Sequence, residues 1–269
     1  MSEVESSGWQ RDLALIADAA RQAGNVALEY FRRSPEVWWK NEGRSPVSAA
    51  DFAANEALES MLRSARPDYG WLSEETEDGD DRLSRETLFV VDPIDGTRAF
   101  LAGLDTWCVS VAVVHRGRPV AGVLNAPALE EAYSAVEGGQ ALKNEAPVTV
   151  SQRQPGEVCR LAAAEDVVAS FAPDFRRQVE RAKHIPSLAY RLAMVADGRL
   201  EGTFVKPNSH DWDLAAADLI LECAGGHLVD LVGNRLVYNK PDVSHRSLCG
   251  ASASSLPEIL LQLTSRRAS

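Results

Sequence analysis

The chain has 269 residues, 45% of them hydrophobic, and a formal net charge of −11 at pH 7. This acidic balance argues against a nucleic acid polymer as a partner, and it would repel an anionic substrate unless divalent cations mask the site. The sequence shows no signal peptide, no apolar run near the ~20 residues that span a bilayer, and no closely spaced cysteines. We therefore expect a cytoplasmic protein with reduced cysteines and no membrane partner.

The first elements expected along the chain are two amphipathic helices. Apolar residues at helical spacing predict them over residues 10–32 and 48–63. Ser48 is suited to cap the second helix, because Asp51 follows three residues later in its first turn. A carboxylate is thereby expected at the start of this helix.

A later apolar run leads directly into a polar motif. Residues 88–91, Leu-Phe-Val-Val, predict a buried strand, which we expect to end at Asp92 because Pro93 cannot donate a ladder hydrogen bond. An Asp-Gly turn signal and a short helix over residues 97–101 follow, and the first N–H groups of such a helix are available to an anion. The motif thus combines oxygen ligands for a hard cation with a site for phosphate.

Other acidic residues stand at the edges of neighbouring elements. A short strand over residues 71–73 leads to Glu74 and Glu75, and an apolar helix over residues 211–223 carries Asp213 in its first turn. These carboxylates could converge with those of the polar motif in the folded chain.

The polar motif has two other interpretations. Asp-Pro and Asp-Gly are common turn dipeptides, so the segment could be an ordinary connection between a strand and a helix. The haloacid dehalogenase type of phosphatase also ends a strand in two aspartates, but with one residue between them. Here Pro93 and Ile94 separate the carboxylates, which changes their phase along the chain and disfavours that geometry.

The remaining pattern divides the chain into two halves. Residues 105–115, 119–125 and 132–135 predict successive antiparallel strands. Beyond them, strands and helices alternate over residues 158–163, 174–181, 187–196, 202–205, 211–223 and 228–232, before a last helix from about residue 256. This pattern predicts an N-terminal α+β half, residues 1–153, and a C-terminal α/β half, residues 154–269.

Three motifs together resemble the inositol monophosphatase superfamily of magnesium-dependent, lithium-sensitive phosphomonoesterases. They are Asp-Pro-Ile-Asp-Gly-Thr at residues 92–97, the pair Glu74 and Glu75, and Trp-Asp-x-Ala-Ala at residues 212–216. The resemblance implies a layered αβαβα sandwich with the metal site between the halves. The first half would carry most of the metal ligands, and the second would supply Asp213 and the substrate contacts.

The resemblance also implies a role for each residue of the site. Glu74, Asp92 and the carbonyl of Ile94 would hold a first Mg²⁺, and a second would be held by Asp92, Asp95 and Asp213. Glu74 would also bind a weaker third ion through water. Asp51 and Thr97 would polarise the attacking water, and the N–H groups of Gly96 and Thr97 would cradle the phosphate. An all-oxygen ligand set of this kind suits Mg²⁺.

The substrate expected from the resemblance is a 3'(2'),5'-bisphosphate nucleotide. That branch of the family is favoured by Lys40, by the run at residues 45–48 and by the Leu-Ser-Glu-Glu at residues 72–75. Pro186 stands where the family has glycine before Ser187 of the substrate-facing helix. Because of this difference, the resemblance does not fix the shape of the pocket. Lys40 and Ser187 are candidate substrate contacts. Lys206 and His210, just before Asp213, are candidate contacts to a second phosphate or a sugar hydroxyl, or else a solvated lysine and a helix cap.

Two alternatives and two smaller expectations complete the interpretation. The enzyme could be an inositol-1-monophosphatase, or the chain could be a regulatory binding protein that keeps the fold without its chemistry. Arg191, on the helix over residues 187–196, is expected to be an ordinary surface charge. The resemblance alone implies a homodimer.

Overall fold

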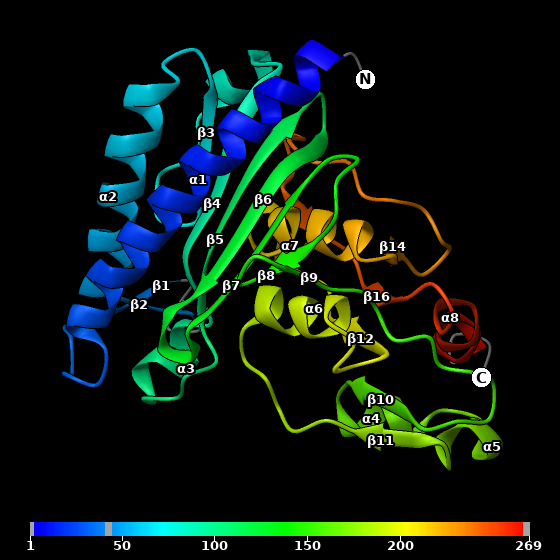
Figure 1. Ribbon diagram of the computed structural model, residues 1–269. Helices are drawn as coiled ribbons and strands as arrows, with labels where there is room; N and C mark the ends of the chain where they lie inside the picture. The colour runs from blue at the N-terminus through cyan, green and yellow to red at the C-terminus, as the bar shows by residue number, and fades with distance from the viewer. Residues whose placement is uncertain (1–2, 41–44, 266–269) are drawn as a thin grey trace.

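A computed structural model describes residues 3–40 and 45–265, and it shows five alternating layers of helices and sheets (Figure 1). Helices α1 and α2 cover the outer face of a seven-stranded sheet, and helices α6 and α7 lie between that sheet and a five-stranded one. Short helices and α8 cover the far side of the second sheet. The expected αβαβα sandwich is confirmed.

The two outer helices form where the sequence predicts them. Helix α1 (Glu3–Tyr30) and helix α2 (Ala49–Ala65) pack together and bury their apolar stripes, including Ile16 and Leu58, against the sheet. The expected cap is present, because the Asp51 carboxylate accepts the backbone N–H of Ser48 at 2.8 Å and its hydroxyl at 2.7 Å. The start of α2 is therefore tied to its own first turn.

The seven-stranded sheet runs in the order β3-β4-β5-β6-β7-β8-β9, with β3 and β4 parallel and the other pairs antiparallel. Both faces of β5 are buried, since helices cover the sheet on either side. The expected turn at Arg116 and Gly117 joins β5 and β6, and both residues have positive φ, as a tight hairpin requires. The strands are β3 (Gly70–Ser73), β4 (Thr87–Asp95), β5 (Cys108–His115), β6 (Arg118–Ala126), β7 (Glu131–Val136), β8 (Leu142–Lys143) and β9 (Ala146–Pro147).

Strand β4 corrects the expectation that the strand ends at Asp92. It continues to Asp95, and its register against β5 shifts between Asp92, which faces Ser110, and Asp95, which faces Cys108. Between these two pairs β4 advances by three residues and β5 by only two, so β4 contains one extra residue, which forms a β-bulge. The bulge accommodates Pro93, because a residue without an N–H is tolerated where the ladder is already interrupted.

The five-stranded sheet runs in the order β11-β10-β12-β16-β14 and rests on the inner pair of helices, α6 (Leu188–Ala196) and α7 (Asp211–Cys223). Helix α7 lies close to β6, because a Cβ at Gly122 would come within 3.0 to 3.1 Å of the Ala216 backbone. The strands are β10 (Cys159–Ala162), β11 (Val179–Arg181), β12 (Gly202–Val205), β14 (Gly226–Asp230) and β16 (Leu248–Ser252).

The region of residues 174–181 differs from the single element expected there. It consists of a four-residue helix, α5 (Pro173–Arg176), followed by strand β11 at the sheet edge. Phe175 on this short helix is buried against the second sheet. The other elements are β1 (Val37–Lys40), β2 (Ser45–Ser48), α3 (Thr97–Leu101), α4 (Glu165–Ala169), β13 (Ser209–His210), β15 (Ser244–His245), α8 (Leu256–Ser265) and the 3₁₀ turns Asp80–Ser84 and Pro127–Leu129.

One apolar cluster continues across the proposed boundary between the halves. It runs from Val90 on β4 through Leu192 on α6 and Leu219 on α7 to Leu228 on β14. The boundary near residue 153 stays a prediction. All four cysteines are free thiols, and no helix in the described ranges is long and apolar enough to cross a membrane.

Candidate active site

Three carboxylates converge where β3, β4 and the start of α7 meet. One oxygen each from Glu74, Asp92 and Asp213 lie within 4.8 Å of one another. Glu74 directly follows β3, and its N–H bonds the Val91 carbonyl of β4 at 3.2 Å, so the parallel pair presents both acids at one edge. Asp213 reaches the same place from the C-terminal half, where its carboxylate accepts the His210 N–H at 2.6 Å.

Burial and mutual repulsion shape the electrostatics of this cluster. Burial, followed by the charges of Asp213 and Glu75, raises the pKa of Glu74 to about 8. Burial and then the charge of Glu74 raise the pKa of Asp92 well above its ordinary value. Ionised carboxylates this close need a compensating cation, and an all-oxygen donor set fits a hard ion such as Mg²⁺.

The bulge in β4 turns the next residues toward the cluster. The Ile94 N–H donates to the Asp92 carboxylate at 3.0 Å, and the Ile94 carbonyl accepts the Thr97 hydroxyl at 3.2 Å. Gly96 follows with φ of 95° and caps α3, and a Cβ there would lie 3.0 Å from the Ser187 Cβ. The Asp-Gly turn therefore needs glycine for both conformation and space.

Thr97 also bonds a buried carboxylate. Its hydroxyl lies 3.3 Å from one oxygen of Asp51, whose other oxygen is held by Ser48. Burial raises the pKa of Asp51, and these hydrogen bonds oppose the rise. Asp51 and Thr97, the residues predicted to polarise the attacking water, are thus hydrogen-bonded to each other, and their role in the reaction stays a prediction.

Asp95 lines the same cavity as the three converging carboxylates, but it is not one of the group whose oxygens lie within 4.8 Å of one another. It accepts hydrogen bonds from the Ser187 hydroxyl, from the Ala189 N–H at 2.7 Å and from the Leu188 N–H at 3.3 Å, all at the start of α6. Burial and the charge of Asp213 raise its pKa to about 7 against these bonds. Ser187 is fully buried and caps α6, accepting the Tyr190 N–H, so its hydroxyl serves the helix and Asp95.

Lys40 contacts the acidic segment rather than open solvent. Its ammonium pairs with Glu75, whose side chain is 2% exposed, and lies 3.4 Å from the Glu74 carbonyl. Burial raises the pKa of Glu75, and Lys40 opposes the rise. In this structure Lys40 holds the segment that carries Glu74.

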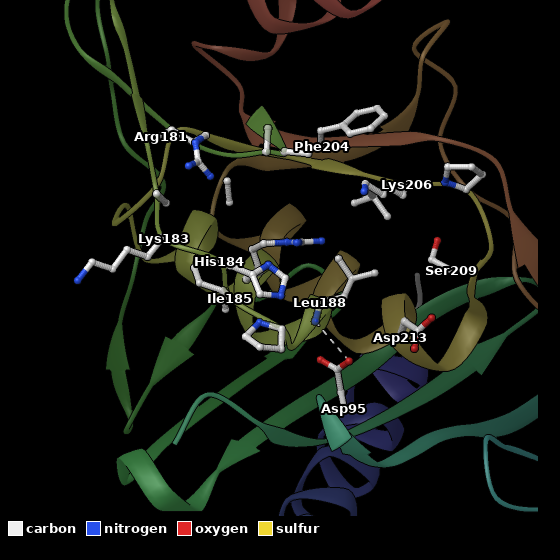
Figure 2. A pocket seen from close by; sticks show the side chains of 18 of the residues that line it. Asp95, Arg181, Lys183, His184, Ile185, Leu188, Phe204, Lys206, Ser209 and Asp213 are labelled. Carbon is white, nitrogen blue, oxygen red and sulfur yellow. Dashed lines mark hydrogen bonds between the residues drawn. The ribbon is translucent and has the colours of Figure 1, made fainter. Parts of the chain in front are cut away.

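Two adjoining cavities open over these residues. The first, of about 280 Å³, is lined by the acidic cluster together with Gly96, Thr97 and Arg98. The second, of about 440 Å³, lies between α6 and β12 and is shown in Figure 2. The cavities share four lining residues: Asp95, His184, Pro186 and Asp213.

The second cavity gathers basic side chains, only one of which, Lys206, was a candidate from the sequence. Arg181, His184 and Arg191 also line it. The expectation that Arg191 is an ordinary surface charge is wrong, because its Nε is shielded from solvent and lacks a hydrogen-bond partner among the described residues. A usable signal was present: Arg191 is the one charged residue in the nine-residue apolar run of α6.

His210 contributes at the mouth of the site mainly through its backbone. It caps α7, and its ring stacks on Trp212 with centroids 4.7 Å apart and planes 10° apart. Its Nδ1 lies 3.8 Å from the Asp213 carboxylate. The helix-cap interpretation of His210 accordingly describes its position in the structure.

The layered sandwich with an all-oxygen acidic cluster at its junction defines a phosphoric monoester hydrolase. The chain belongs to the inositol monophosphatase family, whose profile matches residues 9–267. The family is known to depend on Mg²⁺, in keeping with the donor set described above.

Relatives with several names are similar to this chain. An inositol-1-monophosphatase of Mesorhizobium japonicum is 33% identical over 241 residues, 83% of this chain and 86% of that protein. A histidinol-phosphatase of Chlorobaculum parvum is 33% identical over 235 residues, 85% and 89% of the two chains. The crystal structure of the extragenic suppressor protein suhB from Bartonella henselae superimposes with a TM-score of 0.83 at 28% identity, covering 94% of this chain and 98% of that one.

Proposed function

We propose that the chain hydrolyses a small phosphomonoester with two to three Mg²⁺ ions. The observation that carries the proposal is the convergence of Glu74, Asp92 and Asp213, where burial and neighbouring carboxylates raise the pKa of Glu74 and of Asp92. In this proposal Glu74, Asp92 and the Ile94 carbonyl would hold the first ion. Asp92, Asp95 and Asp213 would hold the second, and Glu74 would support a third through water.

The chain's own groups then have distinct tasks in hydrolysis. When bound, the Mg²⁺ ions would supply Lewis-acid polarisation of water and of the phosphoryl oxygens. Asp51 and Thr97 orient the attacking water. The Thr97 hydroxyl donates a hydrogen bond to Asp51, so its oxygen can accept a hydrogen bond from that water. The N–H groups of Gly96 and Thr97, at the start of α3, bind the phosphate oxygens.

The finer proposal is a substrate with two phosphates, a 3'(2'),5'-bisphosphate nucleotide such as 3'-phosphoadenosine 5'-phosphate. It is supported by the basic lining of the larger cavity, where Lys206 and Arg181 line a space that also reaches Asp95 and Asp213. A volume of about 440 Å³ suits a small-molecule group beyond the reacting phosphate. His210 and Ser187 are proposed to act here by holding Asp213 and Asp95 in place.

Inositol-1-phosphate is the second candidate substrate, favoured by the name of the Mesorhizobium japonicum relative. Phosphate release with Mg²⁺, with and without Li⁺, separates the candidates across 3'-phosphoadenosine 5'-phosphate, inositol 1-phosphate, histidinol phosphate and fructose 1,6-bisphosphate. Preference for the nucleotide, abolished by Li⁺, is the expected result. Preference for inositol 1-phosphate would replace the finer proposal, and no turnover of any ester would overturn both.

The alternative of a regulatory binding protein predicts loss of the metal carboxylates. Glu74, Asp92 and Asp213 are all retained and converge, which favours the enzyme. The homodimer and the cytoplasmic location stay predictions. Sedimentation of the purified chain tests the homodimer, and cell fractionation tests the location.

A further inference from the structure

The larger cavity is lined by a cation, Arg191, whose buried Nε has no hydrogen-bond partner among the described residues. Arg191 lies in the first turn of α6, and its guanidinium makes no hydrogen bond or ion pair with any residue of the ranges 3–40 and 45–265. Burial lowers its pKa, which only the charge of Asp95 opposes. A guanidinium that is removed from water normally hydrogen-bonds to other protein groups. The donors of Arg191 have no such partners in the part of the chain that the structure describes.

The position of Arg191 makes this cost larger. The start of a helix carries partial positive charge, so a cation in the first turn is disfavoured there. The nearby Asp95 carboxylate does not bond Arg191; it accepts hydrogen bonds from the Ser187 hydroxyl and from two N–H groups of α6. An anion entering the cavity would meet donors that nothing else in the described chain uses.

Other donors around the cavity face the same space. Ser209, after β12, has a buried hydroxyl without a hydrogen-bond partner among the described residues. Figure 2 shows Arg181 directing its guanidinium toward the cavity and Lys206 across from Asp95, whereas Lys183 extends away from it. The acids that line the cavity, Asp95 and Asp213, both lie at the edge shared with the acidic cluster.

We propose that this cavity is a subsite for a second anionic group of the substrate, with Arg191 as its specificity-determining residue. The inference rests on the proposed function, and it restricts the substrate class to phosphomonoesters that carry a further phosphate or carboxylate. The planar fork of Arg191 suits bidentate binding of either group, and Lys206, Arg181 and Ser209 complete the subsite. The reacting phosphate occupies the acidic cavity, and the second anion occupies the basic one.

A binding experiment tests the subsite without any metal or turnover. Adenosine 5'-phosphate is titrated calorimetrically into the full chain in EDTA, with Arg191→Met and the matched control Lys183→Gln, whose side chain leaves the cavity. We expect Arg191→Met to weaken binding about 10- to 100-fold, the effect of losing hydrogen bonds to a charged group. Lys183→Gln should bind as the wild type does. Equal affinity of the wild type and Arg191→Met, or no binding by the wild type, would overturn the proposal.

A turnover experiment distinguishes the subsite from a structural role of Arg191. The ratio of kcat/KM for 3'-phosphoadenosine 5'-phosphate to that for adenosine 3'-phosphate, which lacks the second phosphate, should fall about 10- to 100-fold in Arg191→Met. Arg191→Lys, which keeps the charge without the fork, should restore part of the ratio. An unchanged ratio would refute the proposal. If the wild type hydrolyses neither ester while adenosine 5'-phosphate binding still depends on Arg191, the proposed function fails and the subsite stands.

Discussion

The two adjoining cavities differ in charge and in how the chain supplies their residues. The acidic cavity draws Glu74, Asp92 and Asp213 from short motifs at the ends of regular elements. The basic cavity draws Arg181, Arg191 and Lys206 from a strand end, a helix face and a loop that share no motif. The difference indicates that the reaction depends on a compact pattern of carboxylates, whereas recognition of the rest of the substrate depends on scattered side chains.

The largest effect should come from breaking the acidic cavity. Asp92→Asn removes the carboxylate proposed to contact two ions, so we expect phosphate release to fall about 10³-fold or more. The metal-free protein should lose no thermal stability, because the change relieves repulsion with Glu74. Activity assays and melting curves measure both, with the exposed Asp68→Asn as control. Retention of a tenth of the activity would contradict the metal assignment.

The charge of the acidic cavity also predicts a pH dependence of stability. The pKa of Glu74 is raised to about 8 from 4.5, so between these values the folded metal-free protein binds a proton that the unfolded chain has released. The free energy of unfolding should therefore fall as pH rises from 4.5 to 8, by at most ~1.4 kcal/mol per pH unit for one proton.

Thermal unfolding in EDTA across this pH range measures the slope. Mg²⁺ should flatten it by stabilising the ionised cluster, most strongly at the alkaline end. A stability that rises with pH over the same range without metal would show that the cluster is not buried as described.

Gly96 follows Asp95, which lines both cavities, and it packs against Ser187. Gly96→Ala must place its Cβ 3.0 Å from the Ser187 Cβ at a φ of 95°, whereas Gly156→Ala meets nothing within 4 Å at a φ of 91°. Both should lose about 1 kcal/mol to backbone strain, and Gly96→Ala a further ~1 to 3 kcal/mol to overpacking. Urea unfolding of the two variants measures the difference, and equal losses would show that the contact costs nothing.

The smallest expected effect lies at the link between α6 and Asp95. Ser187→Ala removes the helix cap and one donor to Asp95, so we expect a loss of about 1 kcal/mol in unfolding free energy. The Mg²⁺ concentration for half-maximal activity should rise about tenfold, as for loss of a group that orients a ligand. The exposed Ser254→Ala serves as control. A stability loss without any change in Mg²⁺ dependence would confine Ser187 to capping.

Much of the fold was predictable because local signals agreed with tertiary packing. Apolar periodicity placed α2 and α7 within two residues of their ends, and the capping pattern of Ser48 and Asp51 is present as expected. The end of β4 was misplaced, because a β-bulge depends on pairing with β5 and not on Pro93 alone. The strand β11 was missed, because a three-residue edge strand has too short a pattern to separate from a helix.

The residues of the candidate site also differ in how far the sequence predicted them. Glu74, Asp92 and Asp213 could be proposed as neighbours, since each belongs to a motif at the end of an element. The burial of Arg191 was indicated only by its place in the apolar run of α6, because the charge of a residue on a helix does not reveal which face the neighbouring sheet covers.

By itself the sequence determined the helices and strands of the two halves from local periodicity, and the acidic residues and the phosphatase family from short motifs, whose resemblance to that family implied the layered fold. Only the tertiary structure decided that α6 binds Asp95 with its first turn and places Arg191 in a cavity next to the acidic one. The reason is physical: a carboxylate motif carries its chemistry in consecutive residues, whereas the desolvation of a cation is set by distant elements that pack around it.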